Sequence, residues 1–323
     1  MSQPINPSIR PTQTNSPRVA TKFSWSDPDQ RNPAILLGIL CLALVIAYWN
    51  MFSLTSAAWA NPLYSHGYLL PVFALGIFWL RRQPFQWTPP SERWIGVGIL
   101  VGALLIRIFA AIFDMAPVDR LSFIVAMFGI FLLVGGLQCV RWAWPGICFL
   151  VFMFPLPSVL ENSLLMHLQR IATVCSTLIL QTLGIAAYRA GNVITLPGVV
   201  ENLTVAEECS GLRMLTIFGA MSVAMIFLID RPWWDKFIVL LSAIPIAVLS
   251  NVVRIVLTAL LYLLTTDEHA RQLAHDVSGL LMMVWGLGFL WIEFQILSRV
   301  TIPEEVSHVK LATTKRQAPI PIR

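Results

Sequence analysis

The sequence has little charge. Only 12% of its 323 residues are Asp, Glu, Lys or Arg, whereas soluble domains carry about a quarter. Hydrophobic residues make up 57% of the chain, and no polar stretch is long enough to fold as a separate soluble domain. The scarcity of charge therefore excludes an ordinary soluble enzyme. It predicts a polytopic membrane protein with one membrane domain and a short tail at each end.

The sequence also lacks the usual patterns of nucleic-acid and metal binding. Its net charge of +5 is spread over loops and tails without a basic groove or aromatic ladder, so we expect no nucleic-acid partner. No CxxC pair and no His at metal-ligand spacing accompany the five cysteines, so we expect no metal and no cofactor. Four cysteines lie in or beside apolar runs as small core residues, at positions 41, 139, 148 and 175. A disulfide between Cys175 and Cys209 stays open.

Polar, basic ends flank the apolar region. Residues 1–32 are rich in Pro, Ser, Thr, Gln and Asn and lack the apolar core of a cleavable signal peptide, so we expect a disordered tail. Residues 33–298 form the expected membrane domain, and residues 299–323 a second tail. By the positive-inside rule both tails are cytoplasmic and the protein lies in the cell membrane as a multi-pass protein.

The apolar runs predict an all-α fold of about eight transmembrane helices. A loop through Asn61 and Pro62 follows the first helix, a tight turn at Arg141 separates the fourth from the fifth, and a loop over 265–274 precedes the last. The expected spans are 34–51, 64–80, 94–113, 121–138, 142–154, 210–229, 237–264 and 275–297.

Two segments interrupt this pattern. Residues 158–183 carry polar side chains at helical intervals, which favours an amphipathic helix at the outer interface. The alternative, an ordinary span, would invert the topology of everything downstream. Residues 184–208 contain Gly191-Asn192 and alternating Val and Thr, which predicts a short external hairpin.

Arg107 lies in the outer half of the third span. A charge at that depth is costly and normally has a partner or a task. The simpler account is that Arg107 extends towards the outer surface or pairs with Asp114 or Asp119.

Reactive side chains gather at the outer ends of three spans. Cys209 precedes the apolar run that begins near Met214, and a helix N-terminus favours a thiolate. Arg254 and His275 reach the same depth in the predicted topology, His275 by opening the last span, and Asn251 shares a helix face with Arg254. The alternatives are that Cys209 is only a small residue at a helix start, His275 a helix cap and Arg254 a structural ion-pair partner.

Together these three groups support acyl transfer. Cys209 can attack a peptide carbonyl, His275 can hold the thiol proton and deliver it to the leaving amine, and Arg254 can stabilise the thiolate or the tetrahedral oxyanion. The predicted topology places these three groups on the external side of the bilayer.

Five segments resemble the motifs of the exosortase/archaeosortase family, in the family's order and within roughly residues 34–297. They are Tyr64-Ser65-His66-Gly67, Gly191-Asn192-Val193-Ile194, Glu208-Cys209-Ser210-Gly211-Leu212-Arg213, Asn251-Val252-Val253-Arg254-Ile255 and His275-Asp276-Val277-Ser278-Gly279.

The resemblance implies a membrane-embedded cysteine transpeptidase. Such an enzyme cleaves C-terminal sorting signals of the PEP-CTERM kind and transfers the protein to an envelope acceptor. The family's Cys, Arg and His fall on Cys209, Arg254 and His275. The motifs add supporting residues at Ser210, Gly211, Arg213, Asn251 and His66.

Two other functions stay open on the sequence. A purely hydrolytic membrane cysteine protease would use the same three residues. A non-enzymatic transporter or scaffold would use Arg107, Arg254 and His275 as a polar pathway, and it should show an internal repeat of spans, which we do not find.

Overall fold

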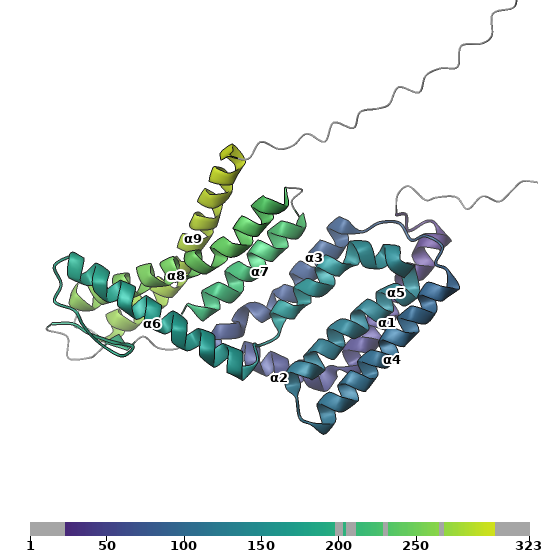
Figure 1. The fold of residues 1–323 in the computed structure, drawn as a ribbon, viewed down its shortest axis with the longest axis horizontal. Helices are drawn as coiled ribbons and strands as arrows, with labels where there is room; N and C mark the ends of the chain where they lie inside the picture. The colour runs from purple at the N-terminus through teal and green to yellow at the C-terminus, as the bar shows by residue number, and fades with distance from the viewer. Residues whose placement is uncertain (1–22, 198–202, 205–210, 229–231, 265–267, 301–323) are drawn as a thin grey trace, which may run out of the picture.

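The computed structural model describes residues 23–197, 203–204, 211–228, 232–264 and 268–300, and these ranges are mainly helical. Three short strands follow α6 (Figure 1): β1 (Tyr188–Ala190), β2 (Val193–Thr195) and β3 (Leu203–Thr204). The helices are α1 (Pro28–Ala47), α2 (Trp49–Trp59), η1 (Pro62–Tyr68), α3 (Leu70–Arg81), α4 (Pro90–Ile112), α5 (Ala116–Phe149), η2 (Leu150–Met153), α6 (Ser158–Thr182), α7 (Leu212–Leu228), α8 (Trp233–Leu264) and α9 (Glu268–Val300).

Six helical segments in the described residues are long and apolar enough to cross a membrane. They confirm a mainly helical, multi-pass membrane protein, whereas the count of eight spans stays a prediction. The six are Pro28–Ala47, Leu63–Arg81, Pro90–Ile112, Ala116–Met153, Ser158–Thr182 and Trp233–Leu264.

The longest of these segments folds back on itself. Gly136 has φ 65° and ψ −168° inside α5. The rings of Phe123 and Phe154 lie 6.3 Å apart, whereas a straight helix would separate them by about 45 Å. Phe131 and Trp142 likewise pack edge to face across the reversal. The two predicted helices on either side of a tight turn are therefore present, with the reversal at Gly136 rather than at Arg141.

The first apolar segment is broken at Tyr48, whose φ of −97° and ψ of 18° end α1. The chain continues as α2, so the loop that we expected before Asn61 is largely helical. The prediction failed because residues 52–59 carry no charge, Gly or Pro to mark a helix end. Thr55 also fits this helix, since its hydroxyl donates to the carbonyl oxygen of Met51 at 2.8 Å.

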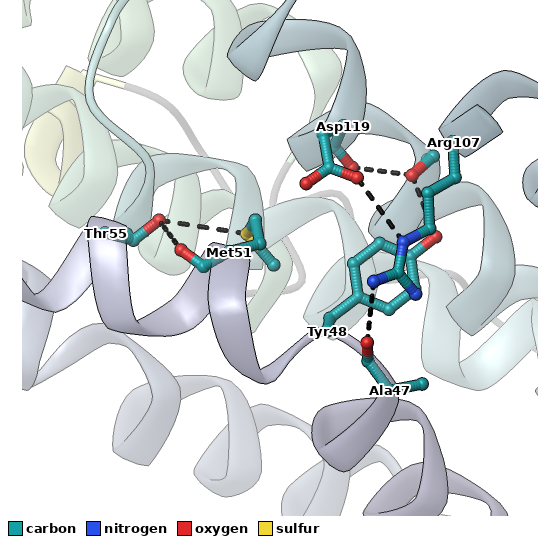
Figure 2. Close-up of polar contacts among 7 residues, drawn as sticks. Ala47, Tyr48, Met51, Thr55, Arg107 and Asp119 are labelled. Carbon is teal, nitrogen blue, oxygen red and sulfur yellow. Dashed lines mark hydrogen bonds and ion pairs between the residues drawn. The ribbon is translucent and has the colours of Figure 1, made fainter. Parts of the chain in front are cut away.

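Arg107 fastens this break to α4 and α5, as Figure 2 shows. Its Nη2 donates to the carbonyl oxygen of Ala47 at 2.6 Å, and its guanidinium carbon lies 3.9 Å from the ring centroid of Tyr48. Its Nε lies 3.7 Å from Asp119 Oδ1. Of the accounts given for this arginine, pairing with Asp119 is confirmed, and the guanidinium serves as a structural clamp.

The hairpin predicted after residue 184 is confirmed. Strands β1 and β2 pair antiparallel around Gly191, which has φ 64° and leads the two-residue turn as in a type II′ hairpin. β3 extends the sheet in the order β1-β2-β3. The sheet therefore leads the chain back towards the residues before α7.

α6 is long and apolar enough to cross a membrane. In Figure 1 it nevertheless lies across α7 and α8, whereas α7 and α8 run side by side. Its buried face includes Gln169, Thr173, Ser176 and Thr177. The interfacial placement of residues 158–183 stays a prediction, and both orientations remain compatible with its length.

Two helix boundaries differ from those we expected. α1 begins at Pro28, inside the expected tail, because Asp27 caps it by accepting from the amide of Asp29 at 3.1 Å. α9 begins at Glu268, so His275 lies two turns inside the helix instead of opening it. The residues before His275 include Ala, Arg, Gln and Leu, which favour a helix and offer no stop signal.

The reversal at Gly136 predicts the effect of Gly136→Ala. Its backbone conformation is nearly exclusive to glycine, and a Cβ there would lie 2.9 Å from Thr88 Cγ2. We expect the variant to lose about 1–3 kcal/mol of unfolding free energy, measured as a lower melting temperature in detergent. Gly102→Ala is the control, because a Cβ at that helical glycine meets nothing within 4 Å. Equal melting temperatures of the two variants would contradict the prediction.

Candidate active site

The beginning of α7 is joined to η1 by a side-chain hydrogen bond. Arg213 Nη2 donates to Ser65 Oγ at 3.2 Å. At the other end of α7, Arg81 Nη1 donates to the carbonyl oxygen of Phe227 at 2.7 Å. Because Ser65 precedes α3 and Arg81 ends it, α3 and α7 run in the same direction. The Tyr64–Gly67 segment and the start of α7 therefore lie at the same end of the bundle.

η1 is itself fixed from two sides. Asn61 caps it, with its Oδ1 accepting from the amide of Leu63 at 2.9 Å. Trp59 donates from its indole to the carbonyl oxygen of Met153 at 2.8 Å, and a Cβ on Gly67 would overlap the same indole. Gly67 is therefore the residue that lets α2 and η1 pack this closely, and Trp59 is a site neighbour that the sequence motifs do not reveal.

His66 also lies in η1, between Ser65 and Gly67. Its imidazole is partly buried, and Nδ1 has no hydrogen-bond partner among the described residues. The ring lies 6.4 Å from that of Tyr64. The structure thus places this predicted supporting residue within one residue of Ser65, the contact of Arg213.

α8 buries a polar stripe inside an apolar helix. Ser250, Asn251, Arg254 and Thr258 are all at most 7% exposed. Their spacing of three and four residues puts them on one helix face. Because ionisable side chains are costly in hydrocarbon, this face must point into the protein, as the prediction for Asn251 and Arg254 requires.

Gly211 brings this stripe against the start of α7. The residue has φ 81°, and a Cβ there would lie 3.2 Å from Asn251 Cβ and 3.4 Å from Asn251 Nδ2. The backbone two residues after Cys209 therefore packs directly on Asn251. One turn further along α8 lies Arg254, which is 7% exposed.

The hairpin covers the same part of α8. Ile194 and Leu196 share a hydrophobic core with Val252 and Ile255, the apolar neighbours of Asn251 and Arg254 in the chain. Asn192 Nδ2 donates to Gln169 Oε1 on α6 at 2.9 Å. Gln169 is a second contact residue that sequence reasoning missed, since one glutamine in an amphipathic helix gives no specific signal.

Two catalytic candidates fall partly or wholly outside this description. Cys209 and Ser210 lie outside the described residues. For His275 the structure gives the backbone, in α9.

α9 packs on α7, where a Cβ on Gly286 would overlap the ring of Phe218. Along the helix axis, His275 lies about 16 Å from Gly286 towards the start of α9. Gly211 lies about 10 Å from Phe218 towards the start of α7, so the two residues are at similar levels. Arg254 and His275 thus lie on neighbouring helices at the end of the bundle where α7 begins.

Contacts therefore link four of the five motif segments into one group. Ser65 meets Arg213, Gly211 meets Asn251, and Ile194 packs in one core with Val252 and Ile255. The model of the family described as transmembrane exosortase (Exosortase_EpsH) matches residues 58–292, which include all five. The chain belongs to the transmembrane exosortase family. No curated protein and no solved structure matches the chain.

The family confirms the resemblance seen in the sequence. It suggests a multi-pass membrane enzyme that sorts proteins as a transpeptidase or protease of the cysteine peptidase kind. For a metal, the described residues offer no group of three or more His, Cys, Asp or Glu side chains that could hold an ion.

The contact of Gly211 with Asn251 predicts a specific defect in Gly211→Ala. The new methyl group would press on Asn251 and displace the backbone that leads to Cys209, and a displacement of this kind costs roughly tenfold or more in rate. Processing of a sorting-signal substrate in cells measures the loss. Gly184→Ala is the matched control, because Gly184 has φ 83° and nothing within 4 Å of its Cβ position. If both variants processed equally well, the contact with Asn251 would have no role in the site.

Proposed function

We propose that this exosortase is a membrane-embedded cysteine transpeptidase that cleaves C-terminal sorting signals of the PEP-CTERM kind and transfers the protein to an envelope acceptor. The observation that carries the proposal is that contacts link four of the family's motif segments around the start of α7 and the Asn251–Ile255 part of α8. The proposed nucleophile is Cys209, with Arg254 and His275 as its catalytic partners.

The proposed reaction has two steps. The Cys209 thiolate attacks the scissile carbonyl, and the collapse of the tetrahedral intermediate breaks the C–N bond to leave a thioester. His275 holds the proton of the thiol and gives it to the leaving amine. An acceptor amine then attacks the thioester and loses a proton to His275, and the C–S bond breaks to release the Cys209 thiolate; water in place of the amine gives plain hydrolysis.

Arg254 suits the stabilisation of negative charge. Its side chain is buried on the α8 face that carries Asn251, where a low local dielectric strengthens its interaction with a thiolate or oxyanion. The proposed role needs both its charge and its planar set of donors.

The proposed substrate is a protein anchored in the same bilayer by its C-terminal signal. The η1 end of α7 is the external side in our assignment, because Arg81, Arg82 and Arg141 mark the opposite end and the positive-inside rule places such residues in the cytoplasm. A signal helix beside the bundle would then present its scissile bond to Cys209 near the outer surface.

Removal of the nucleophile tests the proposal directly. We expect Cys209→Ala to reduce cleavage of a co-expressed substrate by roughly a thousandfold or more, because no other thiol replaces it in the reaction. The substrate carries a C-terminal motif, an apolar helix and a basic tail, and intact mass of the product measures cleavage. Cys175→Ala, a partly buried cysteine on α6, is the matched control and should behave like wild type.

The product mass separates the possible reactions. A product heavier than the cleaved protein supports transfer, whereas a gain of water alone supports the purely hydrolytic protease. Equal cleavage by wild type and Cys209→Ala would rule out the thiol mechanism and favour a non-enzymatic role.

Arg254 gives an independent test of charge stabilisation. We expect Arg254→Ala to lower kcat by about 100-fold or more, and Arg254→Lys to recover part of it because the charge remains without the planar donors. Arg189→Ala in exposed β1 is the control, and melting temperatures show whether each variant is folded. Folded Arg254→Ala that cleaves as fast as the control would exclude this role.

A further inference from the structure

A polar cavity lies at the end of the bundle opposite η1. It has a volume of about 600 Å³ and is formed where α3 ends, where the chain passes to α4, and where α5 has reversed its direction. Its wall combines two guanidinium groups, three side-chain amides and one indole, from Arg81, Gln83, Gln86, Gln138, Arg141 and Trp142. None of these side chains takes part in the proposed chemical steps.

The cavity carries positive charge that its own wall does not neutralise. No Asp or Glu lines it, and within the described residues neither Arg81 nor Arg141 forms an ion pair. Glu92 on α4 lies close to the reversal, but its Oε2 accepts from the amide of Leu137 at 2.7 Å. A ligand that supplies negative charge and several acceptor oxygens would complement this wall.

The wall is also pre-organised. Arg81 is held by its hydrogen bond to the carbonyl oxygen of Phe227, which leaves the rest of the guanidinium fork fixed in direction. The segment from α3 to α4 is fastened by Gln30, which is 2% exposed. Gln30 donates to the carbonyl oxygen of Phe85 at 2.9 Å and accepts from the amide of Phe85 at 2.7 Å. The backbone beside the cavity is therefore fixed by buried contacts, whereas the lining side chains Gln83, Gln86 and Arg141 are exposed.

The position of the cavity favours a lipid as the negatively charged ligand. Exposed tryptophans surround the same end of the bundle, as they do at the boundary between hydrocarbon and lipid headgroups. Arg82, next to Arg81, stacks on one of them, with its guanidinium carbon 3.5 Å from the ring centroid of Trp79. The exposed indoles at this end include Trp79, Trp87, Trp94, Trp144, Trp233 and Trp234.

We propose that this cavity binds the phosphate headgroup of an anionic phospholipid, with Arg81 and Arg141 contacting the phosphate and the three glutamines contacting its polar substituent. Since Arg81 also holds the end of α7, a bound headgroup would tie together α3, α5 and α7. This site is independent of the proposed reaction and would exist in a protein without peptidase activity.

Lipid binding can be measured on the full-length protein in detergent by native mass spectrometry with added phosphatidylglycerol. We expect discrete lipid adducts on wild type and far fewer with zwitterionic phosphatidylcholine. Arg81→Gln and Arg141→Gln should each raise the Kd about fivefold, since a basic residue near a membrane surface contributes about that much to the attraction. Arg93→Gln removes an exposed charge from α4 at the same end of the bundle and should leave the Kd unchanged.

Two further measurements decide between specific lipid binding and the alternatives. Arg141 is exposed, so Arg141→Gln should fold even if Arg81→Gln does not. Inorganic phosphate should fail to displace the lipid at equal concentration if the source is a headgroup in the membrane. Equal binding of the two lipids, an equal loss in Arg93→Gln and Arg141→Gln, or full displacement by inorganic phosphate would each overturn the proposal.

Discussion

The cost of placing polar side chains in hydrocarbon governs the arrangement of the C-terminal helices. α8 carries Asn251 and Arg254 in the middle of an otherwise apolar run, and such residues are stable in a membrane only when they face protein or water. Three elements pack on this part of α8. α7 contacts Asn251 through Gly211, while the hairpin and α6 share a core with Val252 and Ile255 on the neighbouring face of α8. The candidate site thus lies where neighbouring elements bury the polar side chains Asn251 and Arg254 of α8.

The N-terminal half supports the candidate site indirectly, by positioning η1. Arg107 fixes the break between α1 and α2, Trp59 fixes α2 to the end of η2, and Gly67 lets η1 approach that indole. None of these contacts requires reactive chemistry. They position Ser65, which receives the hydrogen bond from Arg213 at the start of α7.

The sequence predicted the parts of the fold that local pattern controls. Long apolar runs located most helices, and Gly191-Asn192 located the hairpin. Predictions of helix boundaries were wrong where no residue in the sequence marks the boundary. The break at Tyr48 depends on a contact with Arg107 from a distant helix. α9 begins before His275 because nothing in residues 268–274 opposes a helix. For the site, the motifs named the facing segments, but Trp59 and Gln169 act only through contacts with residues far along the chain.

Hydrogen bonds at both ends of α7 have a further consequence. Ser65 and Arg81 lie at opposite ends of the η1–α3 segment, and they engage Arg213 and Phe227 at opposite ends of α7. A helix tied at both ends to a parallel neighbour cannot slide along its axis without breaking one of the two bonds. The depth of the α7 start in the bilayer is therefore set by α3. Since residues 205–210 precede that start in the chain, the depth at which the proposed nucleophile Cys209 would meet the proposed membrane-anchored substrate follows from the length of α3 rather than from α7 alone.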